Sequence, residues 1–115
     1  METTKIVKEV DAAEFKGIIS KYSSNIVFSS HTFDRIGDAQ RKIFNVKELM
    51  RVLLQENPVC VGLQLNGRYA AFYKRKFGAL RMIVEIKGSR LEIITFLNSR
   101  HTPNLKRLEN DKKTS

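Results

Sequence analysis

The 115-residue chain has one cysteine, two prolines, no tryptophan and no long run of apolar residues. Because Cys60 is alone, the chain can form neither an internal disulfide nor a cysteine-rich metal site, which fits a reducing cytoplasm. The N-terminus lacks the basic start and apolar run of a signal peptide, and no segment approaches the roughly 20 apolar residues that cross a bilayer. We therefore expect a soluble, unprocessed, cytoplasmic protein with no membrane partner.

Groups that bind metals or cofactors are also scarce. His31 and His101 are the two histidines, and neither belongs to a His-x-x-x-His or Glu-x-x-His pair. The glycines in "NGR" and "KGS" read as turns, so no phosphate-binding glycine loop is present. We expect no metal and no cofactor.

Acidic residues are outnumbered, with 12 Asp and Glu against 21 Lys and Arg and a formal net charge of +9. So large a charge on a small domain favours a polyanionic partner, either nucleic acid or an acidic protein. The length suits one compact domain. We expect a single domain over 1–98 and a basic polar tail over 99–115 that is partly disordered.

Capping signals predict helices in the first half. Asp11 and Glu14 form a capping box that begins a helix over about 12–22. Residues 25–28 read as a short strand, after which Ser29 or Ser30 caps a second helix. A third helix begins at Asn45, where Glu48 completes another capping box, and it stops before Pro58.

The second half alternates apolar and polar residues and contains two hairpin signals, Asn66-Gly67 and Gly88-Ser89. The prediction is an α+β fold with the helices packed on one face of a four- to five-stranded antiparallel sheet. In the second hairpin, alternation from Leu80 and Leu91 places Thr95 and Leu97 on the apolar inner face.

A two-residue turn at Asn66-Gly67 would pair Cys60 with Tyr73 on the outer face of the sheet. That face would then mix tyrosines with arginines, a combination that binds bases by stacking and phosphates by charge. The predicted nucleic-acid-binding residues are Tyr69, Lys74, Arg75, Arg81 and Arg100. The alternatives are an ordinary basic surface or a groove for a partner helix.

His31 would lie in the first turn of the second helix, where the positive helix end lowers the pKa of the imidazole and keeps it available as a base. Arg35, four residues further on, would share its face. The alternative is a solvated helix surface on which Asp34 and Asp38 pair with His31 and Arg35.

Two further features are expected to have mainly structural roles. Glu85 and Glu92 should be cross-strand neighbours, which could split their pKa values for acid–base chemistry, but bridging by Arg81, Lys87 and Arg90 is the commoner outcome. Cys60 on a strand is expected to be a small packed side chain.

The order of these elements, with His31 and Arg35 at a helix start and Thr95 in the closing strand, resembles the RelE/ParE superfamily of small toxin-like proteins. The resemblance covers about residues 25–98 and is to an uncharacterised branch with a His-x-x-x-Arg helix start. It implies a microbial-ribonuclease-like sheet, and members that act as toxins cut mRNA, often on the ribosome, or poison gyrase. An antitoxin neutralises them.

The first functional hypothesis is therefore a toxin-like endoribonuclease of a toxin–antitoxin system that cleaves mRNA without a metal, with RNA or the ribosome and an acidic antitoxin-like protein as partners. Its predicted catalytic residues are His31, Arg35, Tyr73 and Arg81: His31 or Tyr73 transfers the proton, and Arg81, with Arg75, holds the phosphate. The alternative is a non-catalytic module with the same fold that binds nucleic acid or a protein partner.

Overall fold

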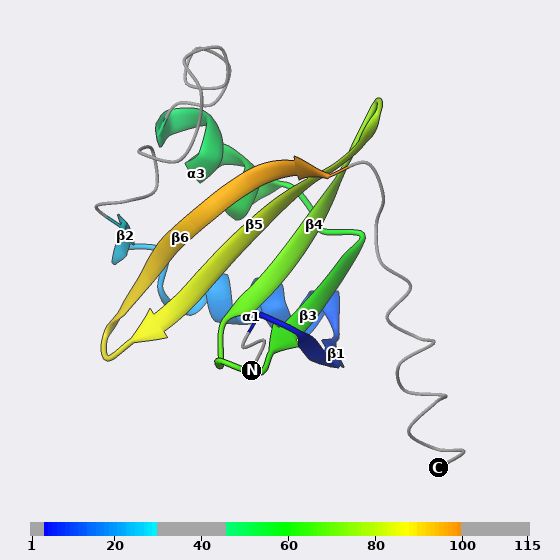
Figure 1. Cartoon of the computed structure of the whole chain (residues 1–115). Helices are drawn as coiled ribbons and strands as arrows, with labels where there is room; N and C mark the ends of the chain where they lie inside the picture. Colours follow the sequence, from blue (N-terminus) through cyan, green and yellow to red (C-terminus); the bar gives the residue numbers. More distant parts are fainter. Residues whose placement is uncertain (1–3, 30–45, 100–115) are drawn as a thin grey trace.

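The computed structural model describes residues 4–29 and 46–99, which form a six-stranded sheet and two helices (Figure 1). The strands are β1 (Ile6–Val10), β2 (Ile26–Phe28), β3 (Cys60–Gln64), β4 (Tyr69–Arg75), β5 (Gly78–Lys87) and β6 (Arg90–Ser99), and the helices are α1 (Ala12–Lys21) and α3 (Val46–Gln55). His31 and Arg35 with their predicted helix, and Arg100 with the predicted tail, lie outside the described residues.

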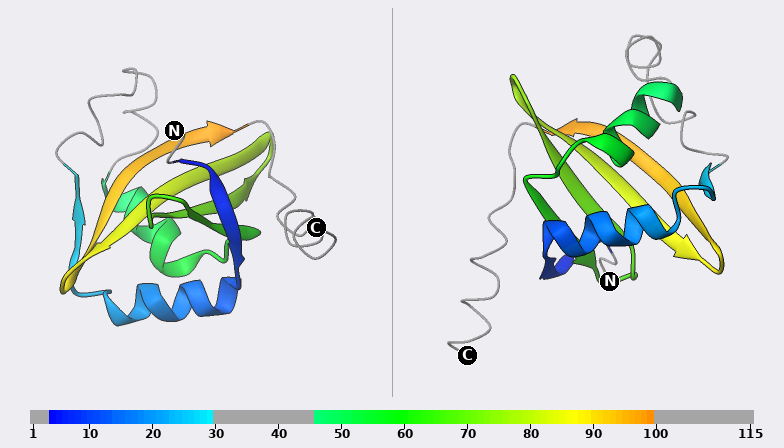
Figure 2. Two further views of the ribbon diagram at one scale, coloured as in Figure 1. Left: turned by 60° about the horizontal axis from the view of Figure 1, so that its bottom comes forward. Right: turned by 180° about the vertical axis from the view of Figure 1, so that it is seen from behind.

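The sheet has the strand order β1-β3-β4-β5-β6-β2. The predicted antiparallel meander is present as β3 to β6, and β1 adds an antiparallel strand next to β3. The prediction of a wholly antiparallel sheet was wrong, because β2 runs parallel to β6 at the other edge. Both helices lie on one face of the sheet, as the front and rear views show (Figures 1 and 2). The α+β class is thus confirmed.

Helix α1 begins as the capping signal predicted. Asp11 Oδ1 accepts hydrogen bonds from the backbone N–H groups of Ala13 (2.8 Å) and Glu14 (3.2 Å), which have no partner inside the helix. One turn later, Lys16 Nζ donates to the carbonyl oxygens of Leu54 and Glu56, both at 3.0 Å. A cation at the C-terminal end of α3 also complements its dipole, so Lys16 joins the two helices.

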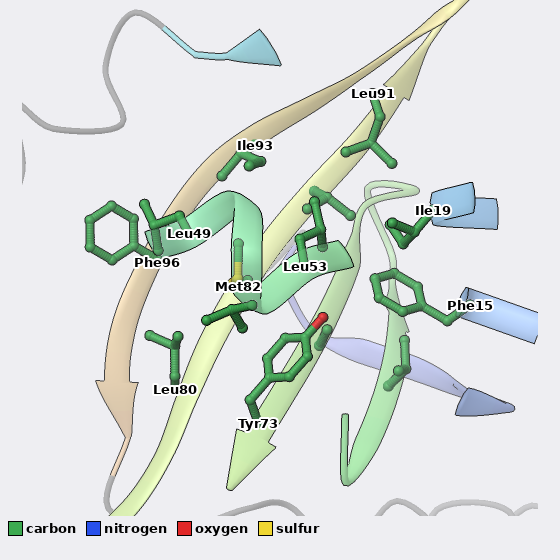
Figure 3. Close-up of a cluster of buried hydrophobic side chains, with 14 of the residues drawn as sticks. Phe15, Ile19, Leu49, Leu53, Tyr73, Leu80, Met82, Leu91, Ile93 and Phe96 are labelled. Carbon is green, nitrogen blue, oxygen red and sulfur yellow. The ribbon is translucent and has the colours of Figure 1, made fainter. Parts of the chain in front are cut away.

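The main hydrophobic core lies between the helices and the sheet (Figure 3). Helix α1 contributes Phe15 and Ile19, and α3 contributes Leu49 and Leu53, all fully buried. The facing side chains of the sheet include Tyr73, Leu80, Met82, Leu91, Ile93 and Phe96. The amphipathic spacing of the helices is therefore satisfied by one shared core.

The predicted register of the first hairpin was wrong by one residue. Cys60 lies opposite Phe72, and the loop has three residues, because Gln64 N donates to Arg68 O (2.8 Å). Gly67 has φ 86°, whereas no described non-glycine residue has a positive φ, so Asn66 does not adopt the conformation of the predicted turn. A shift of one residue moves every side chain of β4 to the other face. Tyr73 consequently lies in the core instead of on the outer face.

The second hairpin matches its prediction near the turn and departs from it further along. Ile86 pairs with Leu91 around Gly88-Ser89, as expected. An irregularity then changes the register, so that Val84 pairs with Ile93 but Ile83 pairs with Thr95. The extra residue, Ile94, is a β-bulge that exchanges the faces of the residues after it. Phe96 is thus the buried residue in place of the predicted Thr95 and Leu97.

Gly62 of β3 provides a stability prediction. A Cβ at this position would lie 2.5 Å from Ile6 Cγ2 and 3.0 Å from Ile6 Cδ1, well inside contact distance. Gly62→Ala should lower the free energy of unfolding by about 1–3 kcal/mol, because the Ile6 side chain or the strand that carries it must shift to make room. Urea denaturation measures the loss.

Ile6→Ala supplies the control for Gly62→Ala. With the Ile6 side chain shortened, adding the methyl group at Gly62 should cost much less, and the double-mutant cycle isolates this coupling. Additive losses would contradict the proposed contact.

Candidate functional site

An open groove of about 1020 Å³ lies between α3 and the turn that joins β4 to β5. We call it the α3 groove. Four of its lining side chains are cations: Lys47 and Arg51 from α3, Arg75 from the end of β4, and Lys76 from the turn after it. The other lining residues are Glu48, Met50, Leu54, Gln55, Phe77 and Asn98. Positive charge thus dominates a concave surface that also offers apolar side chains.

The β4–β5 turn sets one wall of the groove. Arg75 pairs with Gly78, so Lys76 and Phe77 form a two-residue turn, and Gly78 takes φ 93° where the chain leaves it. This turn leaves the Phe77 side chain 85% exposed, against 37–52% for the other exposed large hydrophobic residues of the described chain. Lys76 Nζ lies 5.6 Å from the centre of the Phe77 ring, a cation–π distance. An aromatic ring and a cation are therefore presented together.

Two arginines of the groove converge on one carboxylate. Arg75 forms a double hydrogen bond with Glu56, with Nη1 to Oε1 at 2.8 Å and Nη2 to Oε2 at 3.2 Å. Arg51 Nη2 donates to Glu56 Oε2 at 2.8 Å, and Arg51 also pairs with Glu48. Paired guanidinium groups of this kind recognise carboxylates and phosphates. Glu56 therefore holds the two arginines side by side.

The pKa values follow from these pairs. The hydrogen bond from Arg51 lowers the pKa of Glu48, and the same bond, with that to Glu56, raises the pKa of Arg51. Desolvation favours a higher pKa for Glu56, but the hydrogen bonds from Arg75 and Arg51 outweigh it, so the pKa of Glu56 is lowered. Glu48, Glu56 and Arg51 are thus charged at neutral pH.

The predicted binding residues do not form one surface. Arg75 lines the α3 groove, whereas Arg81 lies opposite Phe72 and, like Lys74, is on the face of the sheet away from the helices. The prediction that Arg75 and Arg81 together hold a phosphate is therefore wrong. Arg81 Nε is buried and has no hydrogen-bond partner among the described residues.

The one-residue change of register also moves the two predicted tyrosines from the outer face of the sheet to its core face. Tyr69 packs against the main core, with its ring centre 5.9 Å from that of Phe15. Tyr73 is fully buried, and burial raises the pKa of its hydroxyl far above the ordinary value. Its placement on an exposed outer face was wrong, and a buried, protonated phenol is not positioned to contact RNA.

The two carboxylates of the second hairpin are bridged by cations, which is the structural alternative to acid–base chemistry. Glu85 and Glu92 are cross-strand neighbours, as predicted. Lys87 Nζ lies 3.3 Å from Glu85 Oε2 and 3.4 Å from Glu92 Oε1, and Arg90 reaches Glu92 at 3.6 Å. Arg68, which was not expected here, contacts Glu85 at 3.4 Å where Arg81 was predicted. These cations neutralise both carboxylates.

Cys60 is half-buried, and this burial, with the nearby charge of Glu9, raises the pKa of its thiol to about 11. The thiol is then protonated at neutral pH and a poor nucleophile. Within residues 4–29 and 46–99, no group of three or more His, Cys, Asp or Glu side chains could hold a metal ion. No helix in the same part of the chain is long and apolar enough to span a membrane.

Comparisons by family model, by curated sequence and by solved structure found no match to this chain. The resemblance to the RelE/ParE superfamily thus stays a prediction from the sequence. The predicted site residues did not include Phe77, Lys76, Lys47 or Arg51. The signal was available in "RKFG", where two cations and an aromatic residue precede a glycine between two apolar runs.

Proposed function

We propose that the protein is a nucleic-acid-binding module that holds its ligand in the α3 groove. The observation that carries this proposal is the convergence of Lys47, Arg51, Arg75 and Lys76 around a groove with an exposed aromatic ring at its rim. Cations that follow a phosphate backbone, combined with an aromatic side chain, are the usual components of such a surface. The net charge of +9 supplies the long-range attraction.

Removing two groove cations tests the proposal. Lys47→Gln/Lys76→Gln should weaken RNA binding and make the slope of log K against log salt shallower by roughly 1.4, about 0.7 for each lost phosphate contact. Neither Lys47 nor Lys76 takes part in the Glu56 network, so the fold should be kept. Fluorescence anisotropy with a labelled RNA oligonucleotide, between about 50 and 200 mM salt, gives the slope.

Lys5→Gln/Lys8→Gln is the matched control, since it also removes two exposed positive charges but lies at β1, away from the groove. It should leave the slope nearly unchanged. Equal effects of the two double variants, or affinity that does not respond to salt, would contradict binding in the groove.

A toxin-like endoribonuclease is the second candidate. The helices on one face of an antiparallel meander agree with the architecture that the resemblance implies. Against it, Tyr73 is buried, and Arg75 and Arg81 lie on opposite faces. Incubation of mRNA with the protein in EDTA, alone and with translating ribosomes, decides: cleavage products favour the nuclease with its acidic antitoxin-like partner, and intact RNA favours the binding module.

A further inference from the structure

We infer that the α3 groove selects single-stranded nucleic acid by stacking an unpaired base on the Phe77 ring. This inference rests on the proposed function and specifies its ligand. Phe77 is 85% exposed at the tip of a two-residue turn. A single exposed hydrophobic residue needs no explanation by itself, so the inference rests on the cations that surround this ring in the groove.

The turn fixes the backbone from which the Phe77 ring projects. Arg75 and Gly78 pair across the base of the turn, and Arg75 is fixed from the other side by its two hydrogen bonds to Glu56. Lys76 lies within cation–π distance of the ring and restricts it further. A ring on a fixed turn loses less conformational entropy when a base stacks on it than a ring on a flexible loop.

The cations around Phe77 are placed for the phosphates that flank a stacked base. Arg75 and Lys76 precede the ring in sequence, and Lys47 and Arg51 line the facing wall on α3. The groove is open and, at about 1020 Å³, lies at the top of the range for small-ligand pockets, which suits a length of chain. Phosphates can therefore lie along the groove while a base turns toward the ring.

Only a single strand can use both features at once. In a duplex the base faces are stacked on one another and unavailable, so a duplex offers the groove its phosphates alone. Stacking accepts every base, because each has a flat π face. We therefore expect a preference for single strands with little dependence on sequence.

The test compares three RNA probes of equal charge: a labelled oligouridine, a duplex of matched phosphate number, and an oligonucleotide of the same length without bases. The natural protein should bind oligouridine about 10-fold more tightly than the other two. Phe77→Leu, which keeps an apolar side chain but removes the ring, should bind oligouridine about 5- to 10-fold more weakly and leave the other affinities unchanged. Phe77→Tyr should restore the preference.

Phe77→Trp gives a spectroscopic readout, because the chain contains no other tryptophan. Stacking of a base on the indole should quench its fluorescence with oligouridine and not with the abasic strand. Equal binding of all three probes, or a Phe77→Leu variant that keeps the preference, would overturn the inference while leaving groove binding intact. Failure of every probe to bind would overturn the proposed function as well and point to an acidic protein as the ligand.

Discussion

Tyr73→Ala should lower the free energy of unfolding by about 3–5 kcal/mol, whereas Tyr73→Phe should leave it unchanged or raise it by about 1 kcal/mol. The Tyr73 ring is fully buried in the main core, so its removal leaves a cavity among well-packed side chains. The hydroxyl is buried with no hydrogen-bond partner among the described residues, and its loss therefore removes an unsatisfied group. Urea denaturation followed by circular dichroism measures both changes.

The two Tyr73 variants also separate structure from catalysis. If the protein cleaves RNA, Tyr73→Phe should keep that activity, because a protonated, buried phenol does not reach the ligand. A large loss of cleavage in a stable Tyr73→Phe protein would restore Tyr73 as a catalytic residue. Destabilisation by more than about 1 kcal/mol would mean that the hydroxyl has a partner in solution.

Glu56→Gln should change affinity and stability in opposite directions. The carboxylate occupies the guanidinium groups of Arg51 and Arg75, so it competes with a phosphate for the same donors. Neutralising Glu56 should tighten RNA binding about 5-fold, which corresponds to roughly 1 kcal/mol. It should also lower the free energy of unfolding by about 1–2 kcal/mol, because charge-assisted hydrogen bonds between α3 and β4 are lost. Anisotropy and urea denaturation measure the two quantities.

Glu48→Gln is the matched control for Glu56→Gln. Glu48 pairs with Arg51 on the exposed surface of the helix, so its loss should destabilise the protein less than the loss of Glu56 and change RNA affinity less. Weaker RNA binding by Glu56→Gln would show that holding the arginines in place outweighs the competition.

Glu56 also gives a pH dependence with a definite sign. Its pKa is lower in the folded protein than its ordinary value, so the folded state favours the ionised form. This contribution to stability is fully present above the unfolded pKa of about 4.3 and is lost as the pH falls through the folded pKa. The acid-induced loss of stability should be smaller in Glu56→Gln than in the natural protein.

Signals within a few residues of each other predicted the local structure well. Asp11 caps α1, Gly88-Ser89 forms the second hairpin turn, and α3 occupies the segment between its predicted cap and Pro58. Each depends on neighbouring residues and elementary backbone preferences. The α+β class followed from the change of apolar period near Val59.

The faces of the strands were harder to predict, because they depend on single-residue details. In the turn between β3 and β4, Gly67 has a positive φ and Asn66 does not. This difference changes the register and places Tyr73 in the core. The bulge at Ile94 did the same for Phe96. The alternation of β4 is consistent with either register, since Tyr and Phe are both acceptable core residues.

The α3 groove could not be read from local sequence, because its walls are separated by some 20 residues and meet through tertiary packing. Arg51 and Arg75 come together through Glu56, which follows the end of α3. The sequence separations of the Arg51–Glu56 and Arg75–Glu56 pairs match neither the helical nor the strand period. The exposed Phe77, in contrast, was detectable as an aromatic residue at a glycine-bounded turn.

The pairing of β2 with β6 has a consequence for synthesis of the chain. Phe28 pairs with Ile93, so β2 leaves the ribosome about 65 residues before its partner does. At about 5–20 residues per second, this strand waits roughly 3–13 s for its neighbour. Strand β1 has a shorter delay, since β3 is complete at Gln64. The nascent protein can therefore assemble from its β1 edge, and the last strand to be translated is the one that brings β2 into the sheet.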